Sequence, residues 1–229
     1  MRKYLFILCI ILCIPAMANE GVTWFRSCAI SPDGSTIVFT YKGDLFTVSS
    51  QGGQATRLTS NTAYDGYPHW SPDGKTIAFS SDRCGGFDVF TISKNGGTPK
   101  RLTTHSANET VEGFLDNQHV LYTSSYGPTA TDIYFPGAFS QVYSVDTEGH
   151  RPQLFSVVAM EKISINKQGE LLYQNVKGYE DEWRKHHRSP VTRDLYLTQA
   201  NPKNRTFKQI TTDNCEFRNP VWAPDGKAY

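Results

Sequence analysis

The densest group of side chains able to do chemistry is Trp183-Arg184-Lys185-His186-His187-Arg188. Arg184 and Arg188 are suited to hold a peptide carboxylate through paired hydrogen bonds. The alternative is a solvated loop whose positive charges balance the three acidic residues just before it, at 180–182. Neighbouring histidines point apart in a strand, which argues against a metal site. The candidate substrate-binding residues are Arg184, Lys185, His186, His187 and Arg188.

Motifs that would mark a catalytic centre are missing from the sequence. It contains no Gly-x-Ser-x-Gly elbow, no phosphate-binding Gly-x-x-x-x-Gly-Lys-Ser/Thr loop and no His-Glu-x-x-His. The acidic residues Asp33, Asp73 and Asp225 suggest calcium, but each stands in a tight turn that uses its side chain. We therefore expect no catalytic residue, no metal and no cofactor in this chain.

The elements that would position any site begin at a repeated turn. Ser31-Pro32-Asp33-Gly34 recurs as Ser71-Pro72-Asp73-Gly74, and Ala223-Pro224-Asp225-Gly226 keeps three of the four residues. Proline sets the turn, aspartate bonds back to the backbone, and glycine accepts a positive φ. Each complete copy leads into a short strand-like run, at 36–39 and at 76–79. The pattern predicts a tight turn that opens a β-strand.

Other segments recur with the turn. Asp44-Leu45-Phe46 matches Asp88-Val89-Phe90, and Arg57-Leu58-Thr59 matches Arg101-Leu102-Thr103. Weaker copies of the turn, the strands or both occupy 115–122, 141–145, 166–173, 194–197 and 209–211. The unit spans roughly 40 to 50 residues, which is the length of a four-stranded propeller blade. We therefore predict an all-β fold, an incomplete β-propeller with about four to five blades present. Longer later units predict inserted loops on one face.

The matched tryptophans of the repeat are expected to pack in the core rather than stack on a ligand. Trp70 and Trp222 each follow a proline two residues earlier and precede a turn.

Composition limits the partners. The chain has 229 residues and a formal net charge of +1, so it lacks the basic field that a nucleic-acid partner requires. Two of the five cysteines lie in the leader, and the spacing of the others matches no metal motif. Cys28, Cys84 and Cys215 can form at most one disulfide, and we expect them to be small buried hydrophobic residues or idle thiols.

Residues 1–18 have the features of a secretory signal peptide. Arg2 and Lys3 precede an apolar run, and Ala16-Met17-Ala18 supplies small residues at a cleavage site. The run is short for a permanent membrane anchor. We expect the mature chain, 19–229, to be periplasmic or extracellular and to have no membrane association after cleavage.

The repeated segments resemble the Pro-Asp-type propeller repeats of the Tol-system translocation protein, prolyl-oligopeptidase relatives and tricorn-type proteases. Residues 29–46, 101–109 and 178–194 look most like the amino-terminal propeller of exported bacterial tricorn-like serine peptidases. In that family a PDZ-like module and a peptidase core follow the propellers. The resemblance implies that catalytic residues lie downstream of Tyr229 and that this propeller is truncated before ring closure.

Three functions stay open at this point. The resemblance favours a non-catalytic propeller that gates or channels peptide substrates to a peptidase domain of the same polypeptide, so enzyme status is uncertain for this chain alone. The alternative is a stand-alone Tol-type periplasmic propeller that scaffolds protein–protein interaction. A prolyl-oligopeptidase relative would require a Gly-x-Ser-x-Gly motif further along the gene.

Overall fold

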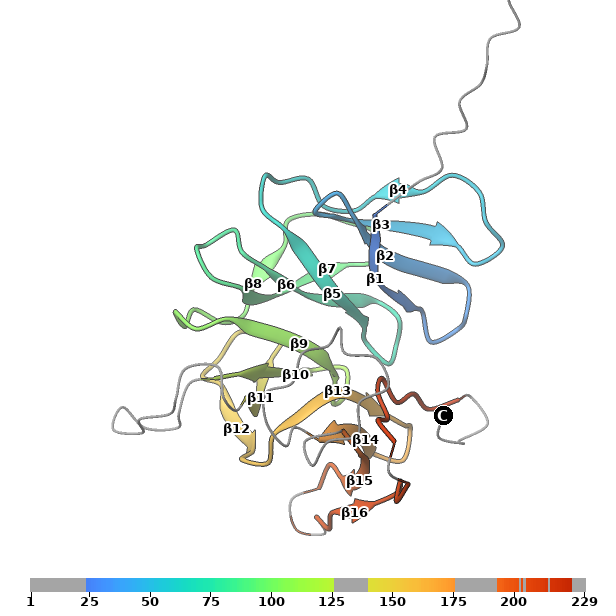
Figure 1. Cartoon of the computed structure of the whole chain (residues 1–229). Coiled ribbons are helices and arrows are strands. Elements are labelled where there is room, and N and C mark those ends of the chain that lie inside the picture. Colours follow the sequence, from blue (N-terminus) through green and yellow to red (C-terminus); the bar gives the residue numbers. More distant parts are fainter. Residues whose placement is uncertain are drawn as a thin grey trace, which may run out of the picture.

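The protein consists of four antiparallel sheets that follow one another in chain order, as the computed structural model in Figure 1 shows. The structure describes residues 24–125, 140–175, 193–201, 203, 205–213 and 215–223. Each sheet has four strands. The sheets are the blades of a β-propeller, and the predicted all-β fold is confirmed. Within the described part, no helical segment has the length and apolar character needed to cross a membrane.

Blades 1 and 2 follow the chain from their inner to their outer strand. Blade 1 contains β1 (Phe25–Ile30), β2 (Thr36–Tyr41), β3 (Asp44–Ser49) and β4 (Thr56–Arg57). Blade 2 contains β5 (Asp65–Trp70), β6 (Thr76–Ser81), β7 (Asp88–Ser93) and β8 (Lys100–Arg101).

Blades 3 and 4 have the same order. Blade 3 contains β9 (Glu109–Phe114), β10 (His119–Ser124), β11 (Gln141–Asp146) and β12 (Gln153–Ser156). Blade 4 contains β13 (Met160–Ile165), β14 (Glu170–Asn175), β15 (Leu195–Gln199) and β16 (Lys208–Gln209). The extra length of these later units falls between their second and third strands, in one and the same connection of each blade.

The repeated turn acts as predicted. Ser31 Oγ donates to Asp33 Oδ1 at 2.5 Å, and the same oxygen accepts the N–H of Ser35 at 3.0 Å. These bonds to the serine hydroxyl and to Ser35 lower the pKa of Asp33 to about 2. Gly34 takes a φ of 72°, which glycine adopts without strain. The aspartate is therefore occupied by its own turn, and Ser71 and Asp73 repeat the bond at 2.7 Å.

The Asp-x-Phe and Arg-Leu-Thr segments form a clamp between the outer strands. Arg57 pairs with Asp44 at 2.5 Å, and Thr59 Oγ1 accepts the Leu45 N–H at 2.9 Å. In blade 2, Arg101 pairs with Asp88 at 2.8 Å, and Thr103 Oγ1 accepts the Val89 N–H at 2.9 Å. Blade 4 keeps the threonine bond, from the Leu195 N–H to Thr211 Oγ1 at 3.0 Å, but has Gln209 in the place of the arginine.

One stacked aromatic pair crosses β-strands two and three of every blade. The four pairs stand at the same register, with ring centroids 5.7 to 5.9 Å apart: Phe39–Phe46, Phe79–Phe90, Tyr122–Tyr143 and Tyr173–Tyr196. Such pairs stabilise a sheet beyond their buried area.

The hydrophobic core lies between blades rather than within them. One cluster joins Val38 and Leu45 of blade 1 to Ile77 and Phe79 of blade 2. Further clusters join blade 2 to blade 3 and blade 3 to blade 4. A single blade therefore cannot bury its own apolar faces, and stacking supplies the core.

The tryptophans contribute to this packing between blades. Trp70 packs against the first cluster and donates its indole N–H to the Ala29 carbonyl of blade 1 at 3.2 Å. Trp222 makes the equivalent bond to the Ser164 carbonyl of blade 4 at 3.1 Å. The core role predicted for Trp70 is confirmed, and Trp222 repeats its bond to the preceding blade.

The three cysteines beyond the leader differ from expectation in one respect. Cys28, Cys84 and Cys215 are free thiols, and all three are exposed. Of the two expected alternatives, burial is wrong, because Cys28 lies on the exposed strand β1 and Cys84 in the β6–β7 loop. The other alternative, idle thiols, agrees with three cysteines that form no disulfide.

Candidate functional site

The inner strands of the blades lie next to one another, and each carries an irregularity in its pairing. The register shifts at Ser27 in β1, between Gly66 and His69 in β5, and between Glu161 and Ser164 in β13. Glu112 has no pairing partner in β9. A bulge frees backbone groups from the ladder and redirects a side chain, and bulges are frequent beside functional sites.

Non-glycine residues at these bulges adopt a left-handed backbone conformation. Ser27, Tyr67 and Lys162 lie at three of the bulges, and Asn219 lies outside the strands, in the segment before Trp222; their φ values are between 44° and 53°. They occupy the same position relative to the following turn, and all four are exposed. This conformation costs about 1 kcal/mol or more for a residue with a Cβ. Its repetition presents a row of side chains along the inner strands.

Four of the inner-strand side chains form what we call the axial cluster: Tyr67, His69, Glu112 and Lys162. The Lys162 ammonium lies 5.6 Å from the Tyr67 ring centroid, although β5 and β13 belong to non-adjacent blades. A Cβ placed on Gly113 of β9 would lie 3.9 Å from His69 Nδ1. The three inner strands thus bring an aromatic ring, an imidazole, an ammonium and a carboxyl group together.

The protonation states of His69 and Glu112 follow from the burial of their titratable groups. Burial, with a smaller contribution from Lys162, lowers the pKa of His69 to about 4. Burial raises the pKa of Glu112 to about 7, against the opposing effect of Lys162. Glu112 Oε2 accepts the Ile163 N–H of the next blade at 3.2 Å, and Thr123 Oγ1 donates to Oε1 at 3.2 Å. His69 is therefore neutral at physiological pH, while Glu112 is poised to titrate.

A second ionic group lies against blade 4. The Arg193 side chain is 8% exposed and lies 3.7 Å from Glu161 and 3.3 Å from Glu216. Arg218 also pairs with Glu216, at 2.7 Å. Gln174 ties this group to the inner strand, since its amide donates to Glu161 at 3.0 Å. These contacts hold the segment 215–219 against blade 4.

The predicted binding residues Arg184, Lys185, His186, His187 and Arg188 lie outside the described residues, as does the leader 1–18. Within the described ranges, no three His, Cys, Asp or Glu side chains come together as a metal site would require. His119 and His150 bond to aspartates of their own turns, with Nδ1 at 2.9 Å from Asp116 Oδ2 and 2.6 Å from Asp146 Oδ2.

The axial cluster was missed from the sequence. A signal was present, because Tyr67-Pro68 and Asn219-Pro220 recur before the two matched tryptophans. Proline cannot donate to a ladder, so an X-Pro pair inside a strand marks a bulge. No comparable signal marks Lys162 or Glu112.

Four-stranded blades that stack with their inner strands next to one another define this protein as a β-propeller. A model of the tricorn protease N-terminal beta propeller domain matches residues 23–229. The chain belongs to that family.

Solved structures share the fold. A putative TolB from Agrobacterium tumefaciens is 19% identical with a TM-score of 0.65, over 91% of this chain and 74% of that one. TolB from Acinetobacter baumannii is 16% identical with a TM-score of 0.66, over 89% and 47%. The tricorn protease is 15% identical with a TM-score of 0.59, over 92% of this chain and 25% of the protease. This chain thus spans only part of each of these proteins.

Proposed function

We propose that this chain is a non-catalytic propeller of an exported tricorn-like serine peptidase. In this role it guides peptide substrates toward a PDZ-like module and a peptidase domain encoded beyond Tyr229. The observation that carries the proposal is the family match together with the axial cluster of that same propeller. The leader at 1–18 supports export to the periplasm or the medium.

The chemistry of the axial cluster suits transient contact with a polypeptide. Tyr67 offers a ring face and a hydroxyl, and Lys162 offers a mobile cation beside it at 5.6 Å. Both side chains are exposed, while neutral His69 and buried Glu112 lie behind them. Aromatic and cationic groups of this kind contact a chain without depending on one side-chain sequence. The segment 184–188 remains a second proposed contact on the same propeller.

The exposure of strand β1 in blade 1 supports the proposal that this propeller belongs to a longer polypeptide. All residues of β1 except Ala29 are exposed, including Phe25 at 54% and Ile30 at 58%. The equivalent strand of blade 3, β9, is almost fully buried. A propeller hides such a face when a further blade packs on it. We propose that a blade encoded outside this sequence covers β1 in the complete ring.

The alternative function is a stand-alone Tol-type scaffold. The two TolB structures have higher TM-scores than the tricorn protease, 0.65 and 0.66 against 0.59. At these identities the likeness supports the shared fold alone. Such a scaffold docks folded partner proteins on one face and has no need to bind extended peptides.

The test is peptide binding by the chain without its leader. We expect extended peptides to bind in isothermal titration calorimetry, and Tyr67→Ala and Lys162→Ala to weaken binding by about 3- to 10-fold, since each removes a contact worth about 1 kcal/mol. Lys208→Ala, an exposed lysine on β16, is the matched control and should bind as the wild type does.

Two outcomes would overturn the proposal. One is a chain that binds no extended peptide. The other is a reading frame that closes the last blade within a few dozen codons after Tyr229, which would favour the Tol-type scaffold.

A further inference from the structure

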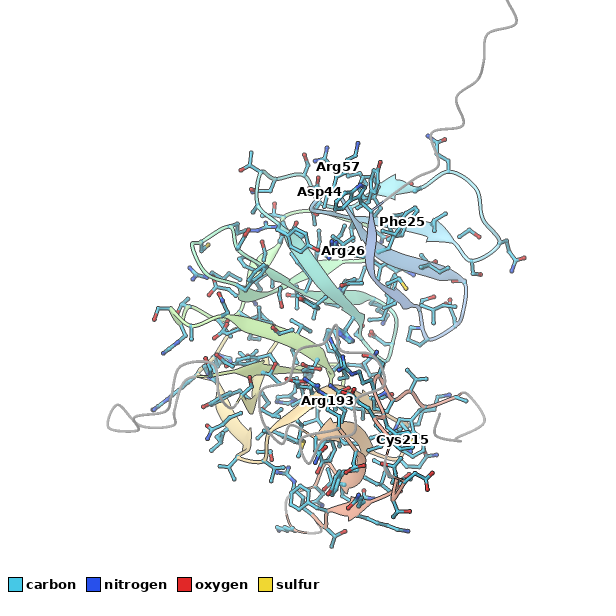
Figure 2. All side chains as sticks on the ribbon, in the orientation of Figure 1. Phe25, Arg26, Asp44, Arg57, Arg193 and Cys215 are labelled. Carbon is cyan, nitrogen blue, oxygen red and sulfur yellow. The ribbon has the colours of Figure 1, made fainter. Side chains whose placement is uncertain are left out.

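A cleft of about 800 Å³ opens on blade 1, beside the connection that leads into blade 2. Its walls come from the start of β1, the β2–β3 hairpin and the connection from β4 to β5. Its volume falls in the range of sites that hold small ligands or short peptide segments. Figure 2 shows Arg26, Asp44 and Arg57 around this part of blade 1, whereas Arg193 lies toward blade 4.

The cleft carries excess positive charge. Arg57 is neutralised by Asp44 at 2.5 Å, and Asp44 also accepts the Asn61 N–H at 3.2 Å. Arg26 and Lys42 also line the cleft, and neither has a carboxylate partner among the described residues. Their contacts are with rings: Arg26 lies 5.9 Å from the Trp24 centroid and Lys42 lies 5.3 Å from that of Tyr41. Two cations therefore remain available to an anion.

A buried hydroxyl also lines the cleft without a partner. Thr40 is 1% exposed, and its Oγ1 makes no hydrogen bond to any residue that the structure describes. The equivalent residue of blade 2, Ser80, accepts the Val111 N–H of blade 3 at 2.9 Å. An unpaired buried polar group costs about 1–3 kcal/mol. The hydroxyl of Thr40 is thus a polar group that a ligand in the cleft would satisfy.

An aromatic wall completes the cleft. Trp24 is 70% exposed, and the Tyr64 ring lies directly against Gly66, where an added Cβ would come within 2.7 Å of Tyr64 Cε1. Burial raises the pKa of Tyr64, with the positive charge of Arg26 acting in the opposite direction. The Tyr64 ring and the Arg26 guanidinium therefore lie close enough to interact electrostatically across the cleft.

We propose that this cleft binds a carboxylate of an extended peptide, held by Arg26 and Lys42 with Thr40 donating its hydroxyl proton, while Trp24 and Tyr64 contact the adjoining apolar part. This inference rests on the proposed function and names the chemical group that the propeller recognises in this cleft. The carboxylate comes either from a peptide C-terminus or from an aspartate or glutamate side chain, since both present the same two oxygens.

The experiment measures binding of three heptapeptides to the leaderless chain by isothermal titration calorimetry. One has a central glutamate and blocked ends, one has glutamine and a free C-terminus, and one has glutamine and blocked ends. We expect the first, the second or both to bind about 5- to 20-fold more tightly than the neutral peptide. The stronger of the two identifies the source of the carboxylate.

The variants separate the cleft from the rest of the surface. Arg26→Ala should remove the preference for the carboxylate, so that the carboxylate peptide binds the variant no more tightly than the neutral peptide does. Arg151→Ala, an exposed arginine outside the cleft, is the matched control and should keep the preference. Raising salt from about 0.05 to about 0.5 M should reduce the preference, because the cations are exposed and screened.

Thr40→Val separates a ligand-binding hydroxyl from one that is merely unsatisfied. The change is nearly isosteric, so the melting temperature should hold or rise as the unpaired group is removed. Affinity for the carboxylate peptide should fall about 3- to 10-fold. A preference that survives both Arg26→Ala and Thr40→Val overturns this inference and leaves the proposed function standing. Failure of all three peptides to bind overturns both.

Discussion

Blades 1 and 2 are built from the same repeat but differ in the side chains that pack over their aromatic pairs. They share the Ser-Pro-Asp-Gly turn, the Asp–Arg clamp and the stacked phenylalanine pair. Over the blade 2 stack lies a cation, since the Arg83 guanidinium is 4.7 Å from the Phe90 centroid. Over the blade 1 stack lies a ring, since Phe25 is 4.9 Å from Phe39 in an edge-on contact. The repeated residues therefore determine the strand geometry of the blade, while the residues that pack over the aromatic pair determine the chemistry of its surface.

The cover of blade 2 is ionic and buried. Arg83 donates to both Asp65 oxygens, at 2.7 and 2.9 Å, and the Asp65 side chain is 0% exposed. The β6–β7 loop, which is longer than the β2–β3 hairpin, supplies Arg83. Blade 1 has Phe25 at the position of Asp65, and Phe25 is 54% exposed. The chain therefore buries this position in blade 2 under an ion pair, whereas the same position in blade 1 stays exposed to solvent.

The seams on the two sides of blade 2 differ in the same sense. Ser80 closes the seam toward blade 3 through the Val111 N–H at 2.9 Å. Its counterpart Thr40 makes no such bond, and a cleft opens there. The blades therefore keep the same strand geometry, while the hydrogen bond that Ser80 makes on one side of blade 2 has no counterpart at Thr40.

The largest expected effect is at Arg83. Arg83→Ala leaves the Asp65 carboxylate buried without its cation, and we expect a loss of about 3–5 kcal/mol in the free energy of unfolding. The corresponding change in the clamp of blade 1, Arg57→Ala, should cost less, about 1–2 kcal/mol, because the Arg57 side chain is 49% exposed. Urea denaturation of both variants measures the difference.

The double variant Asp65→Ala/Arg83→Ala controls for loss of packing. It should recover part of the loss, because no uncompensated charge is left buried. Equal costs for Arg83→Ala and Arg57→Ala would show that the two blades are sealed alike and would refute the contrast between them.

A smaller effect is expected at the seam between blades 3 and 4, where a titratable group replaces the serine hydroxyl. Glu112 caps the Ile163 N–H at 3.2 Å, as Ser80 caps that of Val111. Burial raises the pKa of Glu112 to about 7 from the 4.5 of an ordinary glutamate, so the folded state binds more protons than the unfolded state between these values. The contribution of Glu112 to stability is therefore present below pH 4.5 and is lost as pH rises through 7.

Glu112→Gln keeps an acceptor for the N–H and removes the titration. Relative to this variant, the free energy of unfolding of the wild type should fall by about 2–3 kcal/mol between pH 4.5 and 7.5. His69 acts in the opposite direction, because its pKa is lowered to about 4 and its contribution is lost as pH falls. His69→Gln is therefore the matched control. Parallel stability curves for the wild type and Glu112→Gln would contradict the prediction.

The blade plan could be predicted from sequence because it depends on local chemistry. The turn at Ser31–Gly34 and the Arg-Leu-Thr segment use side chains that bond to nearby backbone, so their spacing shows directly in the sequence. The length of the repeat, roughly 40 to 50 residues, then predicted a β-propeller with four strands in each blade. The seams are less visible, because Thr40 and Ser80 look equivalent in sequence, and only packing shows that one bonds to the next blade.

The axial cluster and the cleft depend on contacts between distant segments. Lys162 and Tyr67 are separated by a whole blade in sequence and meet only when the inner strands stack. The left-handed backbone at Lys162 has no glycine or proline to mark it. The sequence placed the candidate binding residues at 184–188 because charge density is visible there, whereas Arg26 and Lys42 are isolated charges until the fold joins them.

The smallest effect tests the open face of blade 1. Phe25→Ala should lower the free energy of unfolding of this chain by about 1 kcal/mol, since the ring is 54% exposed and its contacts are with Phe39 and Tyr41. If a further blade covers β1 in the complete polypeptide, the same change should cost about 3 kcal/mol or more there, because Phe25 becomes buried. Phe79→Ala, at 0% exposure, should cost about 3–5 kcal/mol in both proteins. An unchanged small cost for Phe25→Ala in the longer protein would mean that β1 stays uncovered, and the contrast between the two blades would then belong to the complete protein as well.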